Sequence, residues 1–217
     1  MLKLFVYFLF LAAALAADTP SALSRNARGW RNILPPVSFR GWVRVPIPAD
    51  QPLSEVSQWK VDRTRGVLIC EGTGGHEFLR YTRVVRNAIF HVEWKYTLAE
   101  GRKNYNSGIY IRNSADGRIW HQAQIGSSSG GYLFGDTLIH GIRMRINLME
   151  QLTEQRVKPA GEWNVSELSA DGPRISFWVN GAVTSVYNNC EVPSGFVGLE
   201  AEGYRIEFRN LKLKLLP

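Results

Sequence analysis

The sequence predicts an all-β protein built as an antiparallel β-sandwich. Short segments along the chain place an apolar side chain at every second position, which is the period of a strand that buries one face. Turn signals separate these segments, and the strongest is Asn180-Gly181 between two β-type runs. The segments do not alternate with helical patterns, and no unit of about 20 to 50 residues repeats. These features favour a sandwich over a doubly wound, propeller or solenoid fold.

The first residues have the features of a signal peptide. Lys3 precedes an apolar run over residues 4–15, and the tripeptide Ala-Leu-Ala that ends at Ala16 fits the small-x-small cleavage pattern. The run is shorter than the ~20 residues of a membrane-spanning helix, although an uncleaved N-terminal anchor is the alternative. We therefore expect residues 1–16 to be removed and the protein to be exported to the periplasm or the extracellular space. No later stretch is long enough to be transmembrane.

The remaining chain divides into a lead-in and one domain. Residues 17–56 are rich in proline and arginine and predict an extended lead-in that wraps the domain. Residues 57–217 are dominated by strand patterns, and their length suits a single sandwich domain. Within it we expect a turn-rich segment at 127–136 and one short helix near 148–156. The predicted strands cover 66–71, 77–82, 88–98, 108–112, 121–125, 142–147, 163–169, 174–179, 182–187, 196–202 and 204–216.

Three successive predicted strands, between Phe90 and Ile125, carry polar side chains opposite their apolar faces. A sheet that buries one face and presents acidic, basic and amide groups on the other suits a polar ligand. If the three strands lie side by side, these groups share one surface. The groups are Glu93, Tyr110, Arg112, Gln122 and Gln124.

Composition and motifs exclude several classes of function. The chain has 26 Lys and Arg against 19 Asp and Glu, a net charge of +7, but its basic residues are scattered. No basic block alternates with aromatic residues, so we expect no nucleic-acid partner. The sequence contains no G-x-S-x-G elbow, P-loop, dinucleotide fingerprint or H-E-x-x-H motif. Serine-hydrolase, phosphoryl-transfer and nicotinamide chemistry are therefore disfavoured.

The two cysteines leave two alternatives open. Export would place Cys70 and Cys190 in an oxidising compartment, where they can form one disulfide, and the alternative is two buried free thiols. Neither the cysteines nor the four histidines have the spacing of zinc ligands. We expect no cofactor, although a divalent metal ion is compatible with the side-chain oxygens of Asn104, Asn106 and Ser107.

Six short motifs occur in order from residue 59 to the last strand. They are WKV from Trp59 with GVL after it, FHVEWK from Phe90, NSGIYIR from Asn106, GEWN from Gly161, the Asn180-Gly181 turn, and FRNL from Phe208. This series resembles the 3-keto-disaccharide hydrolase family, exported bacterial proteins formerly described as a domain of unknown function. The resemblance covers roughly residues 57–217. It implies a concanavalin/LamG-like jelly roll that acts on glycosidic bonds in 3-keto-disaccharides or related glycosides.

The sequence departs from the family pattern at three positions. The family usually has Glu where this chain has Gln122, and often has Asp near Gly126. The family's histidine near the last hairpin is replaced by Glu202. An amide cannot exchange a proton as a carboxylate does. The resemblance therefore implies either a hydrolase whose acid–base group has moved or a non-catalytic carbohydrate-binding module on the same fold.

The candidate site follows from these considerations. Glu200 or Glu202 would transfer the proton, and the forked guanidinium of Arg112 would orient the sugar. Glu93 and Glu207, the other strand carboxylates, are better explained as cross-strand ion pairs. His121 and His140 titrate near neutral pH, but a lone histidine is more often structural. The predicted site comprises catalytic Glu200, Glu202 and Arg112 and substrate-binding Tyr110, Gln122, Gln124, His121 and Asn106, with a carbohydrate as the partner.

Overall fold

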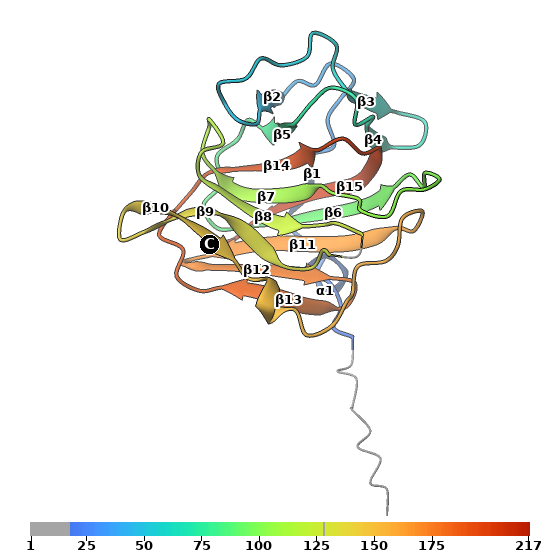
Figure 1. The fold of residues 1–217 in the computed structure, drawn as a ribbon. Helices are drawn as coiled ribbons and strands as arrows, with labels where there is room; N and C mark the ends of the chain where they lie inside the picture. Colours follow the sequence, from blue (N-terminus) through green and yellow to red (C-terminus); the bar gives the residue numbers. More distant parts are fainter. Residues whose placement is uncertain (1–17, 128) are drawn as a thin grey trace, which may run out of the picture.

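The computed structural model describes residues 18–127 and 129–217, so the predicted signal peptide at 1–16 lies outside the described residues. Within this part of the chain, two antiparallel sheets stack face to face (Figure 1). Sheet A has the strand order β13-β12-β11-β6-β15-β4-β3, with β1 beside β15. Sheet B has the order β10-β9-β8-β7-β14-β5-β2. The predicted antiparallel sandwich is confirmed.

Sheet A is formed by eight strands. They are β1 (Trp30–Asn32), β3 (Trp59–Asp62), β4 (Val67–Cys70), β6 (Ala88–Tyr96), β11 (Asn164–Asp171), β12 (Arg174–Val179), β13 (Ala182–Tyr187) and β15 (Ile206–Leu215). Sheet B is formed by β2 (Trp42–Pro46), β5 (Glu77–Tyr81), β7 (Gly108–Asn113), β8 (Trp120–Gln124), β9 (Leu133–Ile139), β10 (Ile142–Asn147) and β14 (Phe196–Ala201).

The core lies between the two sheets and follows the predicted alternation. Phe90, Val92 and Trp94 of β6 are fully buried, as are Ile109 and Ile111 of β7 in the facing sheet. Because strand side chains alternate, this arrangement turns the other face of each sheet outward. The outward face of sheet B is where the candidate site lies.

The assignment of strands to the two sheets corrects one expectation about the polar surface. Glu93 was expected to share a face with Tyr110, but β6 belongs to sheet A and β7 to sheet B. Glu93 points outward from sheet A and pairs with Arg209 of β15, with 2.8 Å between its Oε2 and the arginine Nε. Glu207 pairs in the same way with Arg65 at 2.8 Å. Both carboxylates form ion pairs, the alternative favoured from the sequence.

Two local expectations also differ from the structure. The segment expected to be turn-rich contains the start of β9, because Gly135 allows β8 and β9 to approach closely. A Cβ at Gly135 would lie only 2.1 Å from the carbonyl oxygen of Trp120. The helix expected near 148–156 is a single 3-10 turn, η1 (Met149–Gln151), and the short helix α1 (Ala22–Arg25) was not predicted.

Residues 18–56 contribute to both sheets. β1 pairs with β15 of sheet A, and β2 pairs with β5 of sheet B. The first turn of α1 is held by Glu167 of β11, whose carboxylate oxygens accept hydrogen bonds from the backbone N–H groups of Ala22 and Leu23. The lead-in is therefore bound to sheet A through α1 and β1 and to sheet B through β2.

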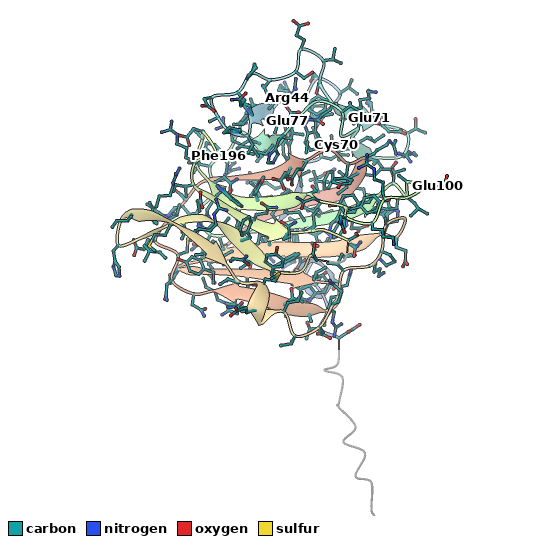
Figure 2. The ribbon with its side chains drawn as sticks, viewed as in Figure 1. Arg44, Cys70, Glu71, Glu77, Glu100 and Phe196 are labelled. Atoms are coloured by element: carbon teal, nitrogen blue, oxygen red, sulfur yellow. The ribbon has the colours of Figure 1, made fainter. Side chains whose placement is uncertain are left out.

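Glu77 joins the two sheets at one end of the sandwich, near Cys70 (Figure 2). Its carboxylate is 1% exposed and lies 2.8 Å from the Arg44 guanidinium of β2. It also accepts hydrogen bonds from the indole N–H of Trp59 at 2.9 Å and from the amide of Gln58 at 3.0 Å. A buried carboxylate with this many donors fixes the position of β5 against β3.

The two cysteines do not form a disulfide. Cys70 and Cys190 are both buried free thiols, which was the second alternative left open from the sequence. Burial raises the pKa of the Cys70 thiol to about 12. Within the described residues, no helix is long and apolar enough to cross a membrane.

Candidate functional site

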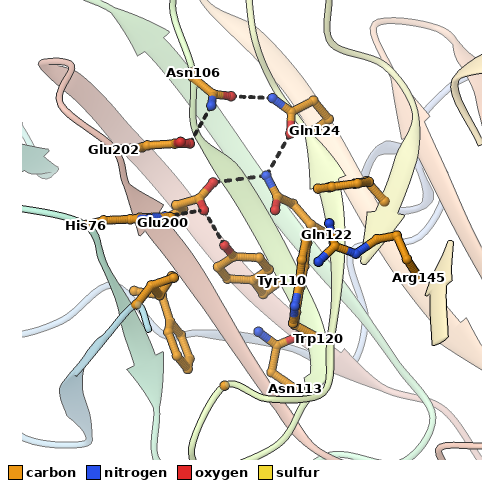
Figure 3. A pocket seen from close by; sticks show the side chains of 14 residues that line it. His76, Asn106, Tyr110, Asn113, Trp120, Gln122, Gln124, Arg145, Glu200 and Glu202 are labelled. Carbon is orange, nitrogen blue, oxygen red and sulfur yellow. Dashed lines mark hydrogen bonds and ion pairs between the residues drawn. The ribbon is translucent and has the colours of Figure 1, made fainter. Parts of the chain in front are cut away.

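A pocket of about 310 Å³ is hollowed into the outward face of sheet B. Strands β5, β7, β8, β9, β10 and β14 and the loops at their ends line it, so distant parts of the sequence meet there. Its floor is polar on one side and aromatic on the other (Figure 3). The lining residues are Ile47, His76, Phe78, Asn106, Tyr110, Asn113, Gly117, Trp120, Gln122, Gln124, Phe134, Arg145, Glu200 and Glu202.

Glu200 of β14 is the centre of the polar side. It is 3% exposed and contacts three side chains from three different segments. The hydroxyl of Tyr110 donates to its Oε1 at 2.5 Å, and the amide of Gln122 donates to its Oε2 at 2.9 Å. Nε2 of His76 lies 2.9 Å from Oε1. With three contacts, the carboxylate is held in one orientation.

A row of amide groups connects Glu200 to Glu202. The Gln122 amide nitrogen also donates to Oε1 of Gln124 at 2.8 Å. Gln124 donates to the side-chain oxygen of Asn106, and Asn106 donates to Oε2 of Glu202. Gln122 donates in both directions, and Gln124 and Asn106 each accept one hydrogen bond and donate the next, so the row ends on a carboxylate at each side and orients both.

Glycine at position 108 makes room for this row. Gly108 of β7 pairs with Gln124 of β8, and the side chain of Gln122 lies across it. A Cβ at this position would be 2.4 Å from the amide nitrogen of Gln122. Any larger residue would therefore displace the group that contacts Glu200.

His76, Glu200 and Glu202 form the titratable part of the pocket, with one ligand-type atom from each lying within 4.8 Å of the others. Burial, followed by the charge of Glu200, raises the pKa of Glu202 above its ordinary value of 4.5. Burial lowers the pKa of His76, but the hydrogen bond and charge of Glu200 and the charge of Glu202 outweigh it. The net pKa of His76 is raised above 6.5. Both shifts favour the protonated form of the group, the neutral acid for Glu202 and the imidazolium for His76.

The opposite wall is aromatic and cationic. Trp120 packs edge-on against Tyr110, with ring centroids 6.2 Å apart, and against Phe134 at 5.0 Å. The guanidinium of Arg145 lies 5.2 Å from the Trp120 ring centroid and 4.9 Å from that of Phe134. Rings combined with a few directed polar groups are typical of small-molecule sites.

The structure does not bring Arg112 to the pocket. Opposite Phe196 to Gly198 of β14, strand β7 carries one extra residue and bulges. Arg112 lies in this bulge and has a φ of +53°. Because the bulge interrupts the alternation of side chains, Asn113 lines the pocket instead. Arg112 is 1% exposed. Its guanidinium donates to the carbonyls of Arg86, Gly172 and Val192 and to the side chain of Asn87.

The two histidines considered from the sequence also lie outside the pocket. His121 shares the core-facing side of β8 with Ala123, and its Nε2 lies 2.9 Å from the hydroxyl of Thr137. Burial lowers its pKa to about 4, so it is neutral at physiological pH. His140 is in the turn between β9 and β10. The predicted residues that do line the pocket are Tyr110, Gln122, Gln124, Asn106, Glu200 and Glu202.

The comparisons with known proteins decide the family. The model of one protein family, described as the 3-keto-alpha-glucoside-1,2-lyase-like domain and abbreviated 3keto-disac_hyd, matches residues 29–214. The chain belongs to this family. The match confirms the resemblance found in the sequence motifs, and it begins in the lead-in, just before β1. Among curated proteins, none matches the sequence.

Solved structures agree with the fold of this 3-keto-alpha-glucoside-1,2-lyase-like domain. A candidate glycosyl hydrolase from Parabacteroides distasonis ATCC 8503 superposes with a TM-score of 0.61 at 15% identity, covering 93% of this chain and 100% of the other. A second one from the same strain has a TM-score of 0.57 at 17% identity, covering 86% and 99%. Carbohydrate-binding module CBM66 from Bacillus subtilis has a TM-score of 0.55 at 14% identity, covering 80% and 95%. The fold is therefore the jelly-roll sandwich expected, in a carbohydrate-related domain.

The site of this family member contains groups that sequence reasoning missed. His76 follows two glycines in the loop before β5, where no strand pattern or motif marks it. Trp120 and Arg145 lie in or beside predicted strands, but their shared wall depends on Phe134 at the start of β9, within the segment expected to be turn-rich. The high tryptophan count, seven in the chain, is a signal that could have indicated an aromatic wall without locating it.

The same three titratable residues are the donor set in the described part of the chain that could hold a metal ion. One imidazole and two carboxylates suit zinc or manganese, whereas Asn106 turns its amide nitrogen, which is not a metal ligand, toward Glu202. A metal bound by these three residues would compete with the proton on His76, since imidazole binds a metal only when neutral.

Proposed function

We propose that this protein is a glycoside-cleaving enzyme that acts on 3-keto-glucosides and related 3-keto-disaccharides outside the cytoplasm. The observation that carries the proposal is the convergence of Glu200, Glu202 and His76 in one pocket. A binding module needs amides and rings, but it does not need two carboxylates with a histidine beside them. The family match supports a keto-sugar substrate, and the apolar sequence of residues 4–15 supports export.

A carbonyl at C3 of a sugar makes the hydrogen at C2 acidic. Removing that proton leaves an electron pair that forms the C1=C2 double bond as the C1–O bond breaks. The departing oxygen then takes a proton and leaves as an alcohol. This reaction needs one base and one acid, and addition of water to the C1=C2 bond would make the overall change a hydrolysis.

Glu202 and His76 fit these two roles. A raised pKa makes the Glu202 carboxylate a stronger base, and a raised pKa keeps His76 protonated near neutral pH as the acid. Glu200 would act as a positioning residue, because it holds the His76 ring through Nε2. The second ring nitrogen is then the one that donates to the departing oxygen.

The amide row and the aromatic wall would bind the sugar. Gln122, Gln124 and Asn106 offer both donors and acceptors, which is what hydroxyl groups require. Trp120 offers an apolar ring on the other side. Gln122 stands where the family usually has a glutamate, and in this proposal Glu202 supplies the proton-transfer group in its place.

Turnover on synthetic 3-keto-glucosides, compared with the parent disaccharides, tests the proposal. We expect cleavage of the keto compounds alone and a slower rate when C2 carries deuterium. Glu202→Gln and His76→Asn should each lower kcat by about 100-fold or more, as expected for loss of a general base or acid. His140→Asn, a change at a histidine outside the pocket, is the control. Unchanged kcat in Glu202→Gln would refute the assignment of the base.

One observation favours a second candidate function, a non-catalytic sugar-binding module. Gln122 faces Glu200 where the sequence resemblance implies a second carboxylate, and its amide is bound on both sides. Saturable binding of disaccharides by calorimetry, with no cleavage of any keto derivative, would establish this alternative. Under it, Glu202→Gln would change affinity by less than tenfold.

A further inference from the structure

A second, smaller cavity adjoins the pocket. It has a volume of about 180 Å³ and shares Ile47, Gly117 and Trp120 with the larger one. Trp120 is therefore a wall common to both. The other walls of the small cavity come from the turn after β2, the loop before β8 and the edge formed by β9 and β10. A ligand longer than one sugar could pass from one cavity to the other along Trp120.

Two aspartates and two arginines line the small cavity, so its charges sum to zero, but they are not all paired with one another. Asp136 of β9 forms an ion pair with Arg145, and Asp116 lies 3.5 Å from Arg118. Arg143 also lines the cavity, on the same face of β10 as Arg145, and is exposed. In the described part of the chain, Arg143 has no ion pair with any carboxylate. With Arg145 of the larger pocket counted, three arginines stand near two aspartates, and Arg143 is the one left without a carboxylate.

We propose that the small cavity binds the second unit of the glycoside and that this unit carries a carboxylate, which Arg143 binds. The inference rests on the proposed function, because the first sugar must occupy the larger pocket. A planar guanidinium can grip both oxygens of a carboxylate. The adjacent Trp120 ring supplies the apolar contact for the body of the same unit. The substrate class is thus an acidic 3-keto-glycoside, such as one with a uronic acid as the leaving group.

A matched ligand pair tests this subsite directly. The 4-carboxyphenyl glucosides and their methyl esters differ only in charge at the end that would face Arg143. Titration calorimetry of both anomers at low salt gives the ratio of the two affinities. We expect the carboxylate to bind about fivefold more tightly than the ester, which is the upper range for one exposed ion pair. Raising the salt concentration should reduce this ratio.

Two arginine variants complete the experiment. Arg143→Gln should bring the ratio to about one while leaving the affinity for the ester unchanged. Arg174→Gln removes the same charge from β12 in sheet A, where the guanidinium donates to Asn188, and should keep the ratio. Equal affinities in the native protein, or a preference that survives Arg143→Gln, would overturn the subsite. Failure of both ligands to bind would also overturn the subsite, whereas the proposed function is tested separately by cleavage of 3-keto-glucosides.

Discussion

The hydroxyl of Tyr110 donates to Oε1 of Glu200 at 2.5 Å, and the two residues come from neighbouring strands of sheet B. Tyr110 pairs with Gly198 across β7 and β14, so its side chain reaches diagonally to the carboxylate. Burial, with the charge of Glu200 next, raises the pKa of Tyr110 well above its ordinary value of 10. The phenol therefore stays protonated at neutral pH and donates this hydrogen bond.

Tyr110→Phe should weaken both the site and the fold. It removes a buried hydrogen bond to a carboxylate, a type of bond that contributes about 1.5–3 kcal/mol. We expect the free energy of unfolding in urea to fall by about 1–3 kcal/mol, with kcat/KM reduced about tenfold or more. Tyr81→Phe, at a half-buried tyrosine outside the pocket, is the matched control. If the two variants behave alike, Tyr110 does not position Glu200.

Much of this arrangement was predictable from strand alternation. The period of two places Tyr110 with Gly108 and Gln122 with Gln124, and these pairs do share the outward face of sheet B. The same period failed at Arg112, because a bulge depends on how β14 is registered against β7, and one strand's sequence does not encode its partner's register. Asn113, which replaces Arg112 in the pocket, gave no separate signal.

The site residues that come from loops or from the aromatic wall could not be predicted from the sequence. His76 is joined to Glu200 only because β5 pairs with β14, a contact between segments more than 100 positions apart. Glu93 shows the reverse error, since consecutive strands β6 and β7 lie in different sheets. Periodicity predicts which residues share a face of one strand, but not which strands share a sheet.

The pH dependence of turnover should be bell-shaped. Glu202 acts as a base only when ionised, so the rate rises with pH through its raised pKa, above the ordinary value of 4.5. His76 acts as an acid only when protonated, so the rate falls through its raised pKa, above 6.5. Measuring kcat/KM between pH 4 and 10 locates both limbs. A profile that keeps rising through the alkaline range would exclude His76 as the acid.

The Glu77 cluster should contribute more to stability than any exposed ion pair. Glu77→Gln leaves the half-buried guanidinium of Arg44 without its charge partner, and since loss of one partner of a fully buried pair costs about 3–5 kcal/mol, we expect a loss near the lower end of that range. Glu71→Gln is the control in the same part of the sandwich (Figure 2), because that carboxylate pairs with Arg205 and Lys60 nearer the surface. The control should cost about 1 kcal/mol or less. Urea unfolding followed by tryptophan fluorescence measures both, and equal losses would show that Glu77 is not the junction between the sheets.

Removal of divalent metal should leave turnover unchanged. In the proposed reaction His76 carries a proton, and a metal held by His76, Glu200 and Glu202 would displace that proton and occupy the base. We therefore expect full activity after treatment with EDTA and inhibition by added zinc. Calorimetry with zinc should detect binding that Glu202→Gln weakens, since that variant removes one of the three donors. Loss of activity in EDTA, with recovery on adding one metal, would replace His76 as the acid by a metal ion that stabilises the departing oxygen.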